Sequence, residues 1–275
     1  MSDITFEKLS DNVGIEVLDV DVARLLNDDE IPAWCLDALD TYGVLLFREL
    51  NADDDAQVAF GRRLGELVKF PQYANPEVME ISFDPANPSA KYFGANDHWH
   101  LDGSLDEIPA KASIMSARVI AAVGGETEFA STYAAYDALT ETEKRRFAEL
   151  RVAHSMSGVQ SRANPNPTPK QAADWARWPV REHPLVWNHE NGRRSLVFGA
   201  TAAHVVDMDL DEGKALLLDL EQRATAPDRV YRHTWTVGDM VMWDNRGLVH
   251  RACEFDRSEP RRMHRTTLAG EEAIG

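Results

Sequence analysis

The sequence has only two cysteines among its 275 residues, Cys35 and Cys253. They are too few and too far apart for a disulfide framework, and neither has a cysteine neighbour with which to form a thiolate metal site. No apolar run approaches the ~18 residues needed to cross a bilayer, and the acidic amino-terminal segment lacks the basic and apolar regions of a signal peptide. We therefore expect a cytoplasmic protein.

Positive charge is also scarce. Lys and Arg total 29 against 46 Asp and Glu, which gives a net charge of −17. Such a chain repels phosphate backbones and anionic lipids, so we expect neither a nucleic-acid nor a membrane partner. The sequence contains no internal repeat and no low-complexity linker, which favours a single domain over residues 1–275.

Hydrophobic periodicity predicts a mixed α+β chain. We expect helices at 28–42, 53–67, 134–150 and 211–224, and strands at 13–20, 44–47, 78–83, 112–121, 127–130, 230–236, 239–243 and 247–252. Many short strands with a few helices favour a closed or double-sheet β core. Residues 157–180 are rich in Pro and Asn and lack periodicity, so we expect a long irregular loop that acts as a lid, with disorder as the alternative.

Three residues form a candidate metal site. His100 and Asp102 are two positions apart, and on a strand both side chains would point to one face. Because such a pair occurs by chance in a chain with nine histidines, a third ligand is needed, and His250 is the best candidate. Two histidines and a carboxylate leave three positions open on Fe(II), whereas on zinc they leave one for water. Ligand identity alone does not separate these metals.

The segment before His250 resembles two antiparallel strands around a tight turn at residues 244–247. We expect Asp244 and Asn245 to build that turn through their hydrogen bonds rather than to act as acid or base.

Six arginines lie within one stretch of 20 residues that contains His250, which predicts an anionic ligand. If residues 256–260 turn the chain back, Arg261 becomes the cross-strand neighbour of His250 and lies beside the metal. Arg265 then shares that face, while His264 points away. A buried arginine in an apolar core needs a carboxylate, which a bound ligand would supply.

Several blocks of sequence now point to one family. They are TYGVLLFREL, NDHWHLDGS, VGGETEF with AAYDAL, VYRHTWTVGDMVMWDNRGLVHRACEFD, and RRMHRTTL. On these blocks the chain resembles the Fe(II)- and 2-oxoglutarate-dependent dioxygenases of the taurine dioxygenase / 2,4-dichlorophenoxyacetate dioxygenase family over nearly its whole length. The last two blocks are most similar to the phenoxyacetate branch. The resemblance implies a double-stranded β-helix, or jelly-roll, core with flanking helices.

The resemblance also implies residue roles. The iron ligands fall on His100, Asp102 and His250, and the 2-oxoglutarate-binding pair falls on Thr127 and Arg261. The positions that meet the substrate fall on Arg265 and Asn96. Where the taurine-specific branch has a histidine this chain has VKFPQYANP, which makes taurine a poor candidate and leaves Lys69, Gln72 or Tyr73 to contact another anion.

The activity that the resemblance implies is an oxidoreductase reaction. It consumes O2 and 2-oxoglutarate, releases succinate and CO2, and oxidises a C–H bond of a small anionic substrate, such as an aryloxyalkanoate or another carboxylate. Relatives are commonly dimers, so a homodimer or higher homo-oligomer is a possible assembly. Two alternatives stay open: a zinc hydrolase or cupin-like isomerase with the same three ligands, and a non-catalytic acidic binding module.

Overall fold

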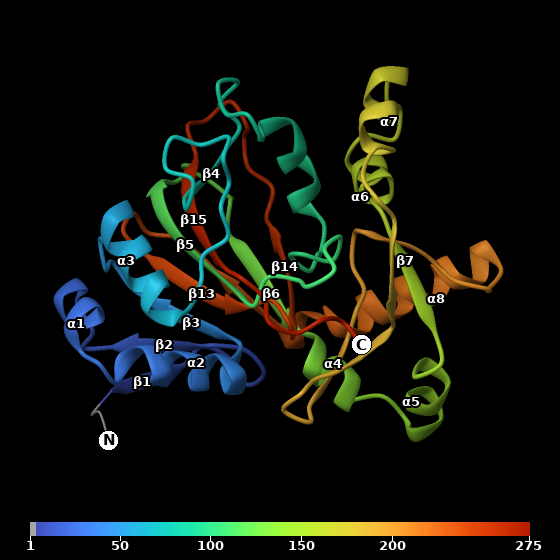
Figure 1. Cartoon of the computed structure of the whole chain (residues 1–275), viewed down its shortest axis with the longest axis horizontal. Coiled ribbons are helices and arrows are strands. Elements are labelled where there is room, and N and C mark those ends of the chain that lie inside the picture. The colour runs from blue at the N-terminus through green and yellow to red at the C-terminus, as the bar shows by residue number, and fades with distance from the viewer. Residues whose placement is uncertain (1–3) are drawn as a thin grey trace.

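Two sheets form the centre of the structure, a computed structural model that describes residues 4–275 (Figure 1). The larger sheet has seven strands in the order β1 (Thr5–Lys8), β2 (Ile15–Leu18), β3 (Val44–Phe47), β13 (Met240–Asp244), β5 (Ala112–Val119), β15 (Arg262–Leu268) and β4 (Met79–Ser82). The smaller sheet has the order β12 (Val230–His233), β6 (Thr127–Ser131) and β14 (Leu248–Ala252). Within these sheets every pair is antiparallel except β2 with β3.

Three helices cover the outer face of the larger sheet: α1 (Val22–Asn27), α2 (Ile31–Tyr42) and α3 (Asp54–Leu64). The amphipathic pattern of α2 buries Ile31, Cys35 and Leu39 along one side, and these pack in one cluster with the sheet. Helix α3 is capped by Asp53, whose side chain accepts a hydrogen bond from the backbone N–H of Ala56.

The alternation of strand side chains divides the core into two layers. On β13, Met240 and Met242 pack with the helices, whereas Val241 and Trp243 belong to the cluster shared with the smaller sheet. The ring of Trp243 lies 5.7 Å from that of Phe129 on β6, measured between centroids. The two sheets are therefore packed face to face.

The remaining elements form an outer layer beside the smaller sheet. Its strands are β7 (Arg151–His154), β8 (Arg181–Pro184) and β11 (Ala202–Val205) in one sheet, and β9 (Val186–Asn188) and β10 (Arg194–Leu196) in another. Its helices are α4 (Thr132–Asp137), α5 (Glu141–Phe147), α6 (Met156–Ala163), α7 (Pro169–Trp175) and α8 (Leu210–Ala224). Two 3₁₀ helices complete the chain, η1 (Ala90–Asp97) and η2 (Pro227–Arg229).

The mixed α+β class and the predicted elements are confirmed, with one helix divided. The helix expected at 134–150 is two helices, α4 and α5, because Thr140 caps the second with a reciprocal Thr140–Glu143 capping box. The strands β1 and β7 to β11 were not predicted.

The expected hairpins around His250 are wrong. Strand β13 pairs with β3 and β5 in the larger sheet, whereas β14 pairs with β6 in the smaller one. Strand β15 returns to the larger sheet, so Arg261 and His250 are not cross-strand neighbours. Both connections carry the chain from one sheet to the other, because each strand finds its partners far away in sequence.

The segment at 157–180 is not the irregular loop that its composition predicted. It contains most of α6 and all of α7. Ser155 caps α6, and Thr168 caps α7 in a capping box with Gln171, with Pro169 at the first helical position. These local signals outweigh the absence of hydrophobic periodicity.

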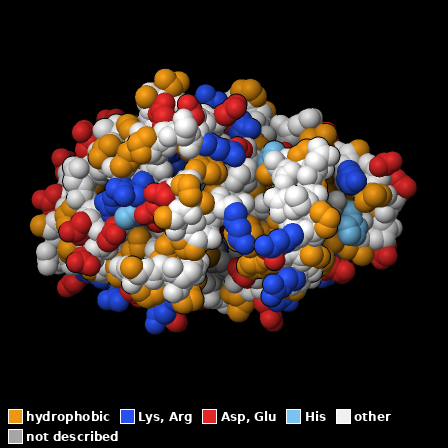
Figure 2. All heavy atoms as spheres, turned by 90° about the horizontal axis from the view of Figure 1, so that it is seen from above, with side chains coloured by type: hydrophobic (Ala, Val, Ile, Leu, Met, Phe, Trp, Pro, Cys, Tyr) orange, Lys and Arg blue, Asp and Glu red, His pale blue; other side chains and the backbone are white. Residues whose placement is uncertain are grey.

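The surface carries charged side chains of both signs between uncharged and apolar ones. In Figure 2 basic side chains gather towards the middle of the visible face, and acidic side chains lie around its edge. Within residues 4–275, none of the helices combines the length and the hydrophobicity that a bilayer crossing requires.

Candidate active site

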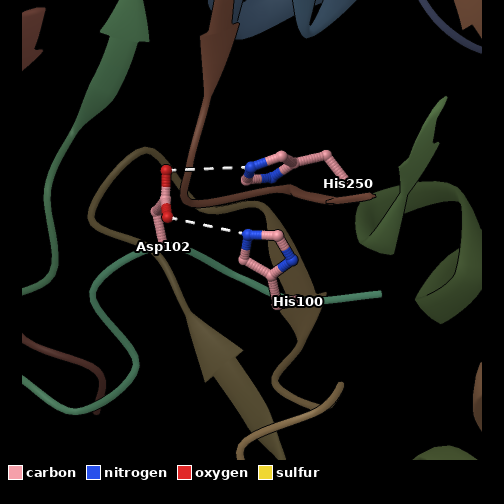
Figure 3. Close-up of side chains that lie close together, drawn as sticks. All are labelled: His100, Asp102 and His250. Atoms are coloured by element: carbon pink, nitrogen blue, oxygen red, sulfur yellow. Dashed lines mark ion pairs between the residues drawn. The ribbon is translucent and has the colours of Figure 1, made fainter. Parts of the chain in front are cut away.

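His100, Asp102 and His250 converge, with one ligand atom from each lying within 4.8 Å of the others (Figure 3). Asp102 Oδ1 lies 3.9 Å from His100 Nε2, and Asp102 Oδ2 lies 3.8 Å from His250 Nε2. Both distances are too long for hydrogen bonds. Two metal–ligand bonds of about 2 Å each can span them, so the spacing fits one cation between the three groups.

The two histidines are joined through their backbones. His100 N donates to His250 O at 3.0 Å, and His250 N donates to His100 O at 2.9 Å. His250 belongs to β14, whereas His100 makes only this isolated bridge and Asp102 lies in the turn that follows it. Between them Leu101 is buried in a separate apolar cluster, so the chain still directs His100 and Asp102 to one side.

Both imidazoles can present a bare nitrogen. His100 Nδ1 lies 2.8 Å from the carbonyl oxygen of His98, so Nδ1 carries the proton and Nε2 keeps its lone pair. Burial lowers the pKa of His250 to about 3, which leaves that ring neutral near pH 7. Neutral imidazoles are the form that binds metal.

Asp102 is held as a carboxylate. Burial raises its pKa, but the Arg265 guanidinium, the two imidazoles and the Ser113 hydroxyl lower it further, so the pKa lies below its usual value. Arg265 Nη1 donates to Asp102 Oδ2 at 2.8 Å, and Ser113 Oγ donates to the same oxygen at 3.3 Å. Two imidazole nitrogens and one carboxylate are a donor set suited to Fe(II).

Arg261 is a buried cation that forms no ion pair with residues 4–275. Its side chain is 7% exposed, its Nη2 donates to Gly125 O at 3.0 Å, and its guanidinium carbon lies 5.2 Å from the centre of the Phe255 ring. Within residues 4–275 no carboxylate comes within ion-pair distance. Burial lowers its pKa to about 10, so the group stays charged at neutral pH. An unpaired buried charge is costly, and an anionic ligand would remove that cost.

Thr127, the other predicted 2-oxoglutarate residue, is buried on β6 opposite Ala252 of β14. Its hydroxyl oxygen accepts from Trp235 Nε1 at 2.9 Å. That contact leaves the hydroxyl hydrogen free to donate to a ligand.

A cavity of about 430 Å³ opens beside the three converging groups. His100, Asp102, Arg265 and Asn96 all line it. Much of the remaining lining is aromatic or aliphatic, from Phe70, Met79, Ile81, Tyr92, Phe93, Leu101, Leu105, Met156, Val159 and Trp178. As expected, His264 points away from Arg265 and contacts Asp54 of α3, with Nδ1 2.7 Å from Oδ1.

Tyr73 is placed differently from the prediction. In the described structure it is not part of the cavity lining, although its neighbours Phe70 and Gln72 are. Its hydroxyl lies 3.2 Å from Glu80 O and 3.1 Å from Asn87 Oδ1, contacts that engage it in the loop after β4. Of the three polar residues predicted in this segment, Lys69, Gln72 and Tyr73, Gln72 is the one that lines the described cavity.

Sequence reasoning missed three polar residues of the site. Ser113 reaches Asp102 from β5, and Ser104 and Thr201 line the cavity with their hydroxyl oxygens 2.8 Å apart. A serine or threonine within a strand or loop carries no motif, so no sequence signal marked them.

Comparison with known proteins gives consistent results. The family model described as "Taurine catabolism dioxygenase TauD, TfdA family" matches residues 5–267. The chain is 34% identical over 249 residues to the alpha-ketoglutarate-dependent 2,4-dichlorophenoxyacetate dioxygenase of Burkholderia sp. (strain RASC), covering 84% of this chain and 83% of that protein. It is 34% identical over 271 residues to the (S)-phenoxypropionate/alpha-ketoglutarate-dioxygenase of Sphingobium herbicidovorans, covering 94% and 91%.

A solved structure extends the similarity to three dimensions. The crystal structure of AAD-2 in complex with Mn(II) and N-oxalylglycine aligns over 100% of both chains, with a TM-score of 0.85 and 33% sequence identity.

Proposed function

This chain belongs to the taurine catabolism dioxygenase TauD, TfdA family, and we propose that it is an Fe(II)- and 2-oxoglutarate-dependent dioxygenase acting on a small anionic organic substrate. It is an oxidoreductase. The observation that carries the proposal is the convergence of His100, Asp102 and His250 beside a cavity that also contains the Arg265 guanidinium. A zinc hydrolase or isomerase would use the same ligands but gives no account of the uncompensated charge on Arg261.

We propose for the core the double-stranded β-helix of the family, within a single domain over residues 1–275. The face-to-face packing of the two sheets supports this, as does the passage of the chain from β13 to β14 and then to β15 in alternate sheets. This arrangement places His250 and Arg265 on opposite sheets that share one interior.

When bound, Fe(II) and 2-oxoglutarate supply the oxidising chemistry, in which O2 is consumed and succinate and CO2 are released. His100, Asp102 and His250 would hold the metal on one side and leave its other positions open. Arg261 and Thr127 would hold the distal carboxylate of 2-oxoglutarate. Both residues are buried, and the guanidinium and the hydroxyl keep hydrogen-bond donors for a ligand beyond the contacts described above.

Arg265 would bind the anionic group of the substrate. Its Nη1 is engaged by Asp102, and its Nη2, as far as residues 4–275 are concerned, contacts only the Met79 sulfur at 3.4 Å. A guanidinium has five N–H donors, so several remain for a carboxylate that enters the cavity. Asn96 lines the same space and would contribute a polar contact.

The apolar lining would accept the organic body of the substrate and exclude water from the reacting atoms. Its aromatic and aliphatic side chains suit an aryloxyalkanoate-like acid. One wall comes from α6 and the segment after α7, through Met156, Val159 and Trp178. Trp178 is 46% exposed, and we propose that residues 157–180 close over the substrate as a lid.

Metal and co-substrate binding test the function. Anaerobic Fe(II) plus 2-oxoglutarate should give a weak visible charge-transfer band with the wild-type protein, and Asp102→Ala should lack the band. In air, phenoxyacetate should increase succinate release in an Fe(II)-dependent manner. A protein that binds neither Fe(II) nor 2-oxoglutarate would exclude the proposed function, and metal-dependent turnover without 2-oxoglutarate would favour the zinc enzyme.

A further inference from the structure

We propose that Asn245 and Ser113 are positioning residues that orient the Asp102 carboxylate for its metal ion. They form a buried chain of hydrogen bonds: Asn245 Nδ2 donates to Ser113 Oγ at 3.1 Å, and Ser113 Oγ donates to Asp102 Oδ2 at 3.3 Å. The inference deepens the proposed function and rests on it, because it concerns the ion that Asp102 would bind.

The two residues are held rigidly by their elements. Ser113 is the second residue of β5, pairs in register with Trp243 of β13, and has no exposed surface. Asn245 follows β13 at the point where the chain leaves the larger sheet, and its backbone N–H donates to Lys111 O at 3.0 Å. Asn245 is also completely buried. The backbone hydrogen bond to Lys111 therefore holds Asn245 beside the start of β5, next to the hydroxyl that its amide contacts.

Chemistry sets the direction of the chain. An ionised carboxylate only accepts hydrogen bonds, so the single Ser113 hydroxyl hydrogen must point to Asp102. Ser113 Oγ then serves as an acceptor, and Asn245 must present its NH2 group rather than its carbonyl oxygen. Within residues 4–275, Asn245 Oδ1 has no hydrogen-bond partner, so the NH2 group makes the side-chain hydrogen bond of this buried amide.

The consequence is an asymmetric carboxylate. Oδ2 accepts from both Ser113 and Arg265, whereas Oδ1 accepts no hydrogen bond from the described part of the chain. These contacts fix the rotation of the carboxylate about its Cβ–Cγ bond. Oδ1 is thereby left with free lone pairs, 3.9 Å from His100 Nε2, which favours this single oxygen of Asp102 as the metal ligand.

The two donors to Oδ2 differ in what can reach them. Arg265 lines the cavity, so a substrate anion can compete with Asp102 for its guanidinium. Ser113 is completely buried and is absent from the described cavity lining, so no ligand there can replace it. The Asn245–Ser113 chain would therefore keep Asp102 oriented while Arg265 exchanges partners during substrate binding.

Mn(II) affinity without 2-oxoglutarate is the test, measured from the electron paramagnetic resonance of free Mn(II). We expect Ser113→Ala and Asn245→Ala each to weaken binding by about 10- to 100-fold. Ser113→Thr, which keeps the hydroxyl, should restore most of the affinity. Because Asn245 acts through Ser113, the double alanine variant should be little weaker than Ser113→Ala alone.

Ser116 provides the matched control. It lies on the same strand, is equally buried, and donates to Gln57 Oε1 at 2.6 Å on the opposite face. Ser116→Ala should lower thermal stability as much as Ser113→Ala does, yet leave Mn(II) affinity at the wild-type value.

The outcomes separate the two proposals. If Asp102→Ala abolishes Mn(II) binding but both Ser113→Ala and Asn245→Ala bind within twofold of wild type, the positioning role is wrong and the proposed function stands. If Asp102→Ala binds Mn(II) as wild type does, the proposed function itself is wrong, and the positioning role with it. Equal weakening by Ser116→Ala would show a general loss of packing and would also overturn the inference.

Discussion

Single residues in this site differ in whether their charge is balanced by the protein. Arg265 donates to Asp102, whereas Arg261 has no carboxylate within ion-pair distance in residues 4–275. A guanidinium cannot shed its proton near pH 7, so the burial of Arg261 costs free energy until an anion binds. This unpaired charge is the reason why we propose Arg261 as the binding site for a ligand carboxylate.

Replacing Arg261 should separate co-substrate binding from stability. We expect Arg261→Gln to weaken 2-oxoglutarate binding to the Mn(II) protein by about 10- to 100-fold, because it removes a charge-assisted hydrogen bond. Its unfolding temperature without ligand should not fall, since an uncompensated buried charge is lost. Titration calorimetry and thermal melts measure the two effects.

The exposed neighbour Arg262 is the control for that experiment. Arg262→Gln should leave 2-oxoglutarate affinity unchanged. Equal weakening in both variants would contradict a specific carboxylate site at Arg261.

The sequence was informative where chemistry depends on local spacing. His100 and Asp102 were recognisable from their separation, and His250, Arg261 and Arg265 from one dense segment. The contact between Asn245 and Ser113 joins residues 132 positions apart, and no local pattern records it. Tyr73 was misplaced because its hydroxyl is engaged by Glu80 and Asn87, which sequence spacing could not indicate.

Among the elements, the connection from β13 to β14 has the strictest packing. Gly247 lies there, and a Cβ built on it would come within 1.7 Å of the Tyr133 ring on α4. Tyr133 is itself buried at 5% exposure and cannot move aside. The absence of a side chain at residue 247 is what lets α4 pack against this connection.

Gly247→Ala should therefore destabilise the fold. We expect the free energy of unfolding to fall by about 1–3 kcal/mol, as for overpacked core positions. Urea denaturation measures it. Gly65→Ala is the control, because its Cβ would meet only Leu268 Cδ2, at 3.9 Å. A loss below about 0.5 kcal/mol for Gly247→Ala would show that the connection adjusts easily.

Element types were easier to predict than element partners. Helices α2, α3 and α8 followed from apolar spacing, and the helices within 157–180 were marked by the capping residues Ser155 and Thr168 rather than by periodicity. The hairpins around His250 were wrong because a tight turn favours pairing of adjacent strands, whereas β13 lies inside the larger sheet and pairs along its two edges with β3 and β5. Strand pairing is a property of the assembled core.

Across the whole molecule, burial holds many histidines neutral. The pKa is lowered by burial at six of the nine: His98, His154, His183, His189, His233 and His250. For His154, which has no exposed surface, the pKa falls to about 3. The stability of this chain, whose net charge is −17, should therefore depend on pH through its buried imidazoles.

The sign of the pH dependence follows directly. Above about pH 6.5 a buried histidine is neutral in the folded and in the unfolded protein, so it contributes no pH dependence to stability. Below this pH the histidine binds a proton in the unfolded protein but stays neutral in the folded protein. Stability should therefore fall between pH 7 and pH 5, with His154 alone accounting for about 2 kcal/mol at pH 5. His154→Gln should reduce this slope in urea unfolding at the two pH values.

Replacement of the exposed His204 is the control for the loss of an imidazole. An unchanged slope in His154→Gln would mean that His154 accepts a proton in the folded protein.

The paired backbone hydrogen bonds between His100 and His250 have a consequence for the timing of metal uptake. These main-chain hydrogen bonds fix the spacing of the two histidines before any ion binds. The entropic cost of ordering the two histidines is incurred when the chain folds, so metal binding would require little rearrangement. The backbone at His100 and His250 should then be the same in the apoprotein and in the metal-loaded protein, and only side chains would have to adjust.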